Sequence, residues 1–72
     1  MTHTEYFNTK VSLAMADICL TIDGQPTNLY STLHYWMIED QEQVSFEDAE
    51  RVMALQPGES TFVGIVEVKR IS

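Results

Sequence analysis

The sequence predicts a small α+β domain in which one helix packs on a face of an antiparallel or mixed sheet. Three observations support this class. Residues 46–56 have helical apolar spacing between a capping serine and a Pro-Gly pair, and residues 61–71 are rich in β-branched side chains. Two β-prone runs flank Asp23 and Gly24, a dipeptide typical of hairpin turns. The expected order is strand, strand, helix, strand, in a single domain spanning residues 1–72.

The helix expected over residues 46–56 has start and stop signals on both sides. Ser45 with Asp48 three positions later resembles a capping box, although Asp replaces the preferred Glu or Gln. Pro57 removes a backbone donor and Gly58 permits a left-handed turn, so the helix should end before them. Its buried stripe is expected to consist of Phe46, Ala49, Val52 and Met53.

Residues 61–71 are expected to form one strand after this helix. The side chains at 62–66 are apolar on both faces, whereas beyond Ile65 one face carries Glu67 and Lys69. The strand should therefore begin covered on both sides and end with one face in water. That pattern favours an interior strand over a free edge.

The first half of the chain allows two interpretations. We favour a hairpin around Asp23 and Gly24, with residues 29–38 in its second strand because they are rich in Tyr, Thr and Trp. The competing interpretation makes residues 28–38 a helix with a stripe of Leu29, Leu33, Trp36 and Met37. Residues 1–8 are expected to be a flexible tail or a leading edge strand.

Net charge constrains the partner more than it constrains the fold. The 72 residues include 11 acids and four bases, for a formal charge of −7. The forty residues 11–50, between Lys10 and Arg51, contain no Lys or Arg. Direct binding of nucleic acid relies on those side chains to neutralise phosphates, so we expect none. A basic partner is favoured, because long-range attraction would speed its encounter with this chain.

Composition argues against a secreted protein, a membrane protein and an enzyme. A single cysteine, Cys19, cannot form an internal disulfide, and the N-terminus lacks a secretory signal, so a cytoplasmic location is expected. No apolar run is long enough to span a membrane. The two histidines and Cys19 lack zinc-ligand spacing, and we expect neither a metal nor a cofactor. In a hairpin that turns near residues 24–25, Cys19 would pair near Tyr30. His34 would then lie ~13 Å further along, too far to activate Cys19 as a nucleophile.

The acidic segment 39–50 has two interpretations. One is a solvated loop and helix start that aid solubility. The other is a recognition surface for a larger protein with a basic surface, such as a nucleic-acid-binding complex, in which carboxylates imitate a phosphate backbone. Aromatic side chains beside the segment would supply contact area. The partner-binding residues expected on the second interpretation are Tyr35, Trp36, Met37, Glu39, Asp40, Glu42, Glu47, Asp48 and Glu50.

One part of the chain resembles a known group of proteins. Residues 45–49, the Pro57-Gly58 pair and residues 66–71 look like the helix–turn–strand unit of small phage proteins that bind and inhibit host enzymes. This resemblance implies a small acidic inhibitor and assigns no functional residues. The alternative is a homodimeric structural or accessory subunit, because an exposed hairpin edge can pair with a second chain.

Overall fold

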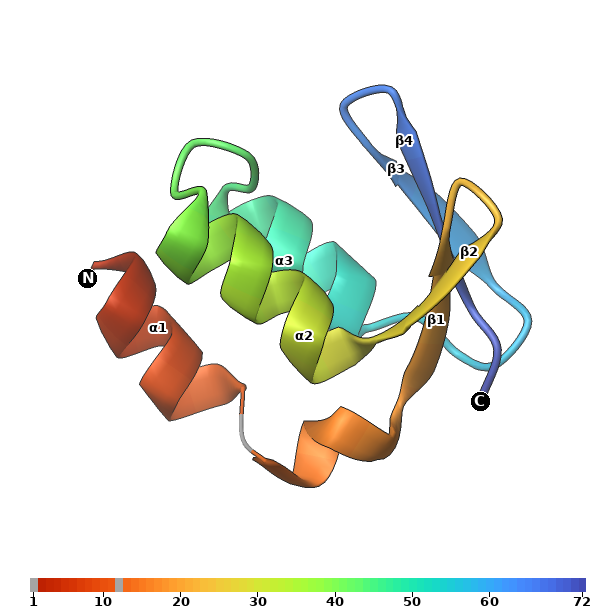
Figure 1. Cartoon of the computed structure of the whole chain (residues 1–72), viewed down its shortest axis with the longest axis horizontal. Coiled ribbons are helices and arrows are strands. Elements are labelled where there is room, and N and C mark those ends of the chain that lie inside the picture. Colours follow the sequence, from red (N-terminus) through yellow and green to blue (C-terminus); the bar gives the residue numbers. More distant parts are fainter. Residues whose placement is uncertain (1, 12) are drawn as a thin grey trace.

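The computed structural model describes residues 2–11 and 13–72, and it has two layers, one of helices and one of strands (Figure 1). The sheet has the order β2-β1-β4-β3, and all three pairings are antiparallel. The α+β class is therefore confirmed, with the antiparallel form of the sheet. The elements are α1 (His3–Lys10), the 3-10 turn η1 (Leu13–Asp17), β1 (Cys19–Ile22), β2 (Gln25–Asn28), α2 (Leu29–His34), the π-helical turn η2 (Tyr35–Glu39), α3 (Phe46–Met53), β3 (Ser60–Val63) and β4 (Val66–Arg70).

The predicted hairpin turn is confirmed at Asp23 and Gly24. Both residues have positive φ, 48° and 85°, as a two-residue type I′ turn requires. This turn pairs Ile22 with Gln25 and Cys19 with Asn28. The second strand is short, however, because β2 ends at Asn28.

The strand predicted over residues 29–38 is wrong, and the competing helical interpretation is correct. The Asn28 side chain accepts a hydrogen bond from the Ser31 amide at 2.7 Å, which caps α2 directly after the strand. Leu29, Leu33 and Met37 recur every four residues and are all buried. This spacing exceeds the 3.6 residues of an α-helical turn, and the wider π turn of η2 accommodates it.

Residues 3–10 form α1, so the tail or edge strand expected over residues 1–8 is wrong; residue 1 lies outside the described residues. Thr2 and Glu5 make a reciprocal capping box, each side chain accepting from the other's amide at 3.1 Å. Tyr6 and Phe7 then bury their rings in the core. This aromatic pair, rather than an amphipathic pattern along the helix, anchors α1 to the rest of the molecule.

The helix predicted over residues 46–56 is confirmed as α3, which ends at Met53. The Ser45 hydroxyl accepts from the Asp48 amide at 3.1 Å, as the capping pattern predicts. Ala49 and Val52 are buried, while Phe46 and Met53 pack against the core from its margin. The stripe therefore faces inward as expected.

The single strand predicted over residues 61–71 is wrong, because the chain turns within it. Gly64, at φ 62°, and Ile65 form a two-residue turn between β3 and β4. Consequently Ile65 is 95% exposed and Phe62 56% exposed, rather than covered on both sides. The interior position holds for β4, which lies between β1 and β3, whereas β3 is an edge strand.

The core lies between the helices and one face of the sheet. Figure 1 shows the helices on one side of the strands, with the opposite side of the sheet uncovered. None of the described helices is long and apolar enough to cross a membrane. The buried apolar residues are Tyr6, Phe7, Val11, Leu20, Leu29, Leu33, Met37, Val44, Ala49, Val52, Leu55, Val63 and Val68.

Candidate functional site

The acidic segment runs from the end of η2 through the loop 40–45 into α3. Figure 1 shows this loop at the end of the helical layer away from the sheet. The acids at positions 39, 42, 47 and 50 are exposed and that at position 40 is half-buried. Solvent-facing carboxylates therefore continue from one helix end to the start of the next.

Helix α1 holds the end of this loop in place. The carbonyl of Val44 accepts a hydrogen bond from His3 Nε2 at 3.1 Å, and Val44 itself is buried. The ring of Phe46 stacks on Tyr6 at 4.7 Å and lies 5.0 Å from the ring of His3. His3 is therefore fixed against the loop, rather than lying on a mobile end. Sequence reasoning missed this contact, because the pattern of α1 gave no sign that it packs on α3.

Two of the predicted carboxylates have a partner within the chain. Asp48 forms an ion pair with Arg51, and the hydrogen bond from Arg51 is the main reason that the pKa of Asp48 is lowered. Glu39 lies 3.9 Å from Nδ1 of His34, a contact that is an ion pair only when His34 is protonated. Among residues 2–11 and 13–72 no further ion pairs occur. The charges of Asp40, Glu42, Glu47 and Glu50 are therefore not compensated by a paired base.

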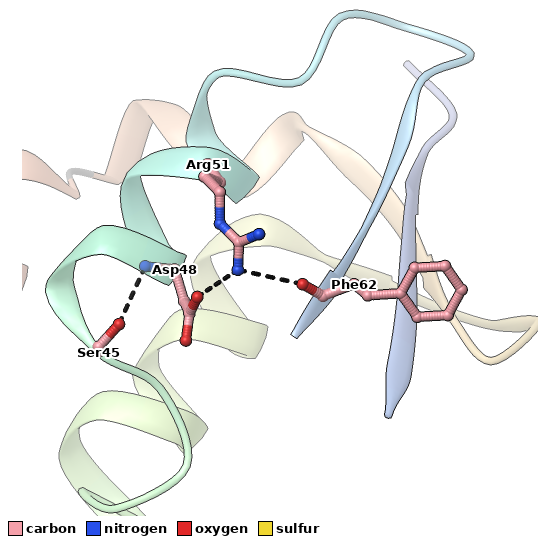
Figure 2. Close-up of polar contacts among 4 residues, drawn as sticks. All are labelled: Ser45, Asp48, Arg51 and Phe62. Atoms are coloured by element: carbon pink, nitrogen blue, oxygen red, sulfur yellow. Dashed lines mark hydrogen bonds and ion pairs between the residues drawn. The ribbon is translucent and has the colours of Figure 1, made fainter. Parts of the chain in front are cut away.

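The two flanks of α3 carry different acids. Glu50 lies toward α1, where burial and then the nearby Glu50 carboxylate raise the pKa of Tyr6 well above its ordinary value. Asp48 and Arg51 lie on the flank toward β3, where Arg51 also reaches the carbonyl of Phe62 (Figure 2). The structure therefore separates Asp48 from the other predicted acids. Its carboxylate accepts a hydrogen bond from Arg51, which also contacts the sheet.

The predicted aromatic contacts differ in their exposure. Tyr35 is 54% exposed, and Trp36 is half-buried at the margin of the core. Met37 is fully buried, so its predicted role as a contact residue does not fit this structure. The physical reason is the helical path of residues 29–39, which turns Met37 into the stripe of Leu29 and Leu33.

Among the described residues, Cys19 and His34 lie on different elements and contact different neighbours. Cys19 lies on β1, where its thiol is exposed and contacts the carbonyl of Asp17 at 3.7 Å. The Cys19 thiol therefore lies outside the core. His34 lies on α2 and packs against the rings of Phe7 and Tyr30 at 5.3 and 6.0 Å. This packing accounts for the position of His34.

The surface that remains after these corrections consists of two aromatic and five acidic side chains. We call it the acidic surface, and its residues are Tyr35, Trp36, Glu39, Asp40, Glu42, Glu47 and Glu50. The described part of the chain contains no pocket and no group of three side chains suited to hold a metal ion. No protein-family model, curated protein or solved structure matches this chain.

Proposed function

We propose that this chain is a non-enzymatic protein-binding module that inhibits or regulates a larger protein by occupying its basic surface. The observation that carries the proposal is the set of exposed carboxylates at positions 42, 47 and 50, which have no paired base. The forty residues 11–50 supply no Lys or Arg to offset them. Such a surface attracts a basic partner over long range and orients it before contact.

The geometry of the loop supports recognition as well as attraction. Because Val44 and Phe46 are held against α1, the backbone that carries the carboxylates on either side of them has a defined position. Rigid placement lowers the entropic cost of binding. Tyr35, exposed beside these charges, offers the kind of ring that dominates many interfaces.

The partner that best fits this chemistry is a protein whose basic site binds DNA or RNA. Exposed carboxylates can compete for the Lys and Arg side chains that otherwise neutralise phosphates. In this proposal the chain acts in the cytoplasm as a phage-type inhibitor, and its targets include host defence complexes. It does not itself bind nucleic acid or a membrane.

The test is a charge-reversed variant compared with a variant of equal net charge. Glu42→Lys with Glu47→Lys alters the acidic surface, whereas Asp17→Lys with Glu67→Lys makes the same charge change at exposed positions elsewhere. The immobilised chain is first used to isolate the protein it retains from the source cell or its host. Association of that purified protein with each variant is then measured at low and high salt.

We expect the acidic-surface variant to associate on the order of tenfold more slowly at low salt, with a smaller difference at high salt. The association rate of the control variant should fall much less, because its altered positions do not face the partner. An equal fall in the association rate of the two variants would show that only net charge determines association. Unchanged association in the acidic-surface variant would exclude this surface as the binding site.

A further inference from the structure

Strand β3 is an edge strand, and its backbone has one free side. The two-residue turn pairs Val63 with Val66, and the register then pairs Thr61 with Val68. In an antiparallel ladder, hydrogen-bonding groups alternate between the two sides of a strand. Since Thr61 and Val63 direct theirs toward β4, Ser60 and Phe62 direct their N–H and C=O groups outward. An edge of this kind is a template for another strand.

A side chain of α3 covers part of this edge. Nη2 of Arg51 donates a hydrogen bond to the carbonyl of Phe62 at 3.1 Å and another to the carboxylate of Asp48 (Figure 2). The Asp48 amide is in turn held by the hydroxyl of Ser45. We call Asp48, Arg51 and the Phe62 carbonyl the edge clasp. It connects the first turn of α3 to the outward side of β3.

The clasp is suited to open without unfolding the molecule. The side chain of Arg51 is 52% exposed, so its bonds compete with water and can be exchanged. The Phe62 ring is also exposed, and the next apolar residue along the chain that reaches solvent is Ile65. Release of Arg51 would therefore leave an outward carbonyl beside exposed apolar side chains.

We propose that Arg51 prevents another strand from pairing with the β3 edge, and that the strand it excludes is β3 of a second copy of this chain. Native sheets often protect their edges with charged side chains. Here the protecting group is a cation that occupies an acceptor which a second strand would need. The wild-type chain is therefore expected to be monomeric through this edge.

The register identifies a second copy as a fitting occupant. In an antiparallel pairing centred on Thr61, the outward groups of Ser60 lie opposite those of Phe62 in the other copy, and the reverse holds by symmetry. Every outward group of the two residues then has a partner.

Charge opposes this pairing, which sets the conditions for the test. Each copy has a formal charge of −7, so two copies repel one another at low salt. Sedimentation velocity over a concentration series in moderate salt is therefore the measurement. Circular dichroism of each variant records whether the fold is retained.

We expect Arg51→Ala to dimerise with increasing concentration while the wild type stays monomeric. Lys69→Ala is the matched control, because it removes the same charge from an exposed position on β4 and leaves the clasp intact. Asp48→Asn keeps Arg51 but weakens its anchor, so it should shift the equilibrium in the same direction to a smaller extent. Asp48→Asn also replaces Arg51→Ala as the test variant if the latter fails to fold.

The double variant Arg51→Ala with Phe62→Pro identifies the face that dimerises. The Phe62 amide points outward, so proline removes a donor needed by the second copy without removing a bond of the β3–β4 ladder. We expect this variant to return to the monomer. The proposal is overturned if folded Arg51→Ala stays monomeric at every concentration, if its dimer persists with Phe62→Pro, or if the wild type already dimerises through β3.

Discussion

Asp48 and Glu47 are adjacent acids on α3 with different surroundings. Glu47 is exposed, whereas Asp48 accepts a hydrogen bond from Arg51 and lies beside the sheet. Arg51 lowers the pKa of Asp48 because it stabilises the charged carboxylate more than the neutral acid. A carboxylate whose pKa is lowered by folding contributes to stability only while it is ionised.

This linkage predicts how the stability difference between the wild type and Asp48→Asn depends on pH. Near neutral pH the wild type is stabilised by ionised Asp48. That contribution is complete above the unfolded-state pKa of ~3.9 and is lost as pH falls through the lower pKa of the folded state. Urea denaturation from neutral to acidic pH should therefore show a difference in unfolding free energy that shrinks on acidification.

Glu47→Gln is the control for this pH series. The Glu47 side chain is next to Asp48 but accepts no hydrogen bond in the described structure. Its difference from the wild type should change much less across the same range. A difference for Asp48→Asn that is constant with pH would contradict the role assigned to the Asp48–Arg51 pair.

At the scale of the elements, Asn28 is the residue at which the chain changes from strand to helix. It pairs with Cys19 as the last residue of β2 and also caps α2 through its side chain. The following run has β-prone residues and a helical apolar stripe, so its local sequence favours neither state clearly. A capping side chain at the boundary, together with burial of Leu29 and Leu33, favours the helix.

We therefore expect Asn28→Ala to lower the free energy of unfolding by about 1 kcal/mol. The lost bond is the one that the Asn28 side chain accepts from the Ser31 amide. Gln25→Ala, an exposed change on the same strand, should have a much smaller effect. Urea denaturation of the three proteins measures the difference, and equal stabilities would show that the cap does not determine this boundary.

Local signals explain which elements were predictable. The turn at Asp23, the cap at Ser45 and the stop at Pro57 are encoded within a few residues, and the structure contains all three. Helix α1 depends on the contacts of Tyr6 and Phe7 with distant helices, which no window of sequence displays. The turn at Gly64 was not predicted, because the apolar residues around it resemble a continuous strand.

The candidate surface, like the fold, was predictable where local sequence determines it and not where tertiary contacts do. Its position in the chain followed from where the acids cluster, and the exposed side chains there include Glu42 and Glu47. The burial of Met37 depends on the path of η2, and the contact of Arg51 with the Phe62 carbonyl depends on the distance from α3 to β3. Both are tertiary features, so charge and composition alone could not identify them.

For the molecule as a whole, uneven charge is the feature that opposes stability. Seven net negative charges lie on a chain of 72 residues, and five of the eleven acids belong to the acidic surface, within residues 39–50. Repulsion among like charges destabilises a compact state. A small domain has little core to offset this cost, so the proposed binding surface should be far from optimal for folding.

Neutralising the acidic surface should therefore increase stability while weakening recognition. We expect Glu42→Gln with Glu47→Gln to raise the urea midpoint at low salt, and this gain to decline at high salt because ions screen the repulsion that was removed. Asp17→Asn with Glu67→Gln removes the same charge from separate exposed positions, so its gain should be smaller. Equal rises in the urea midpoint of the two variants would assign the repulsion to net charge alone. A lower midpoint in the acidic-surface variant would mean that these carboxylates support the fold.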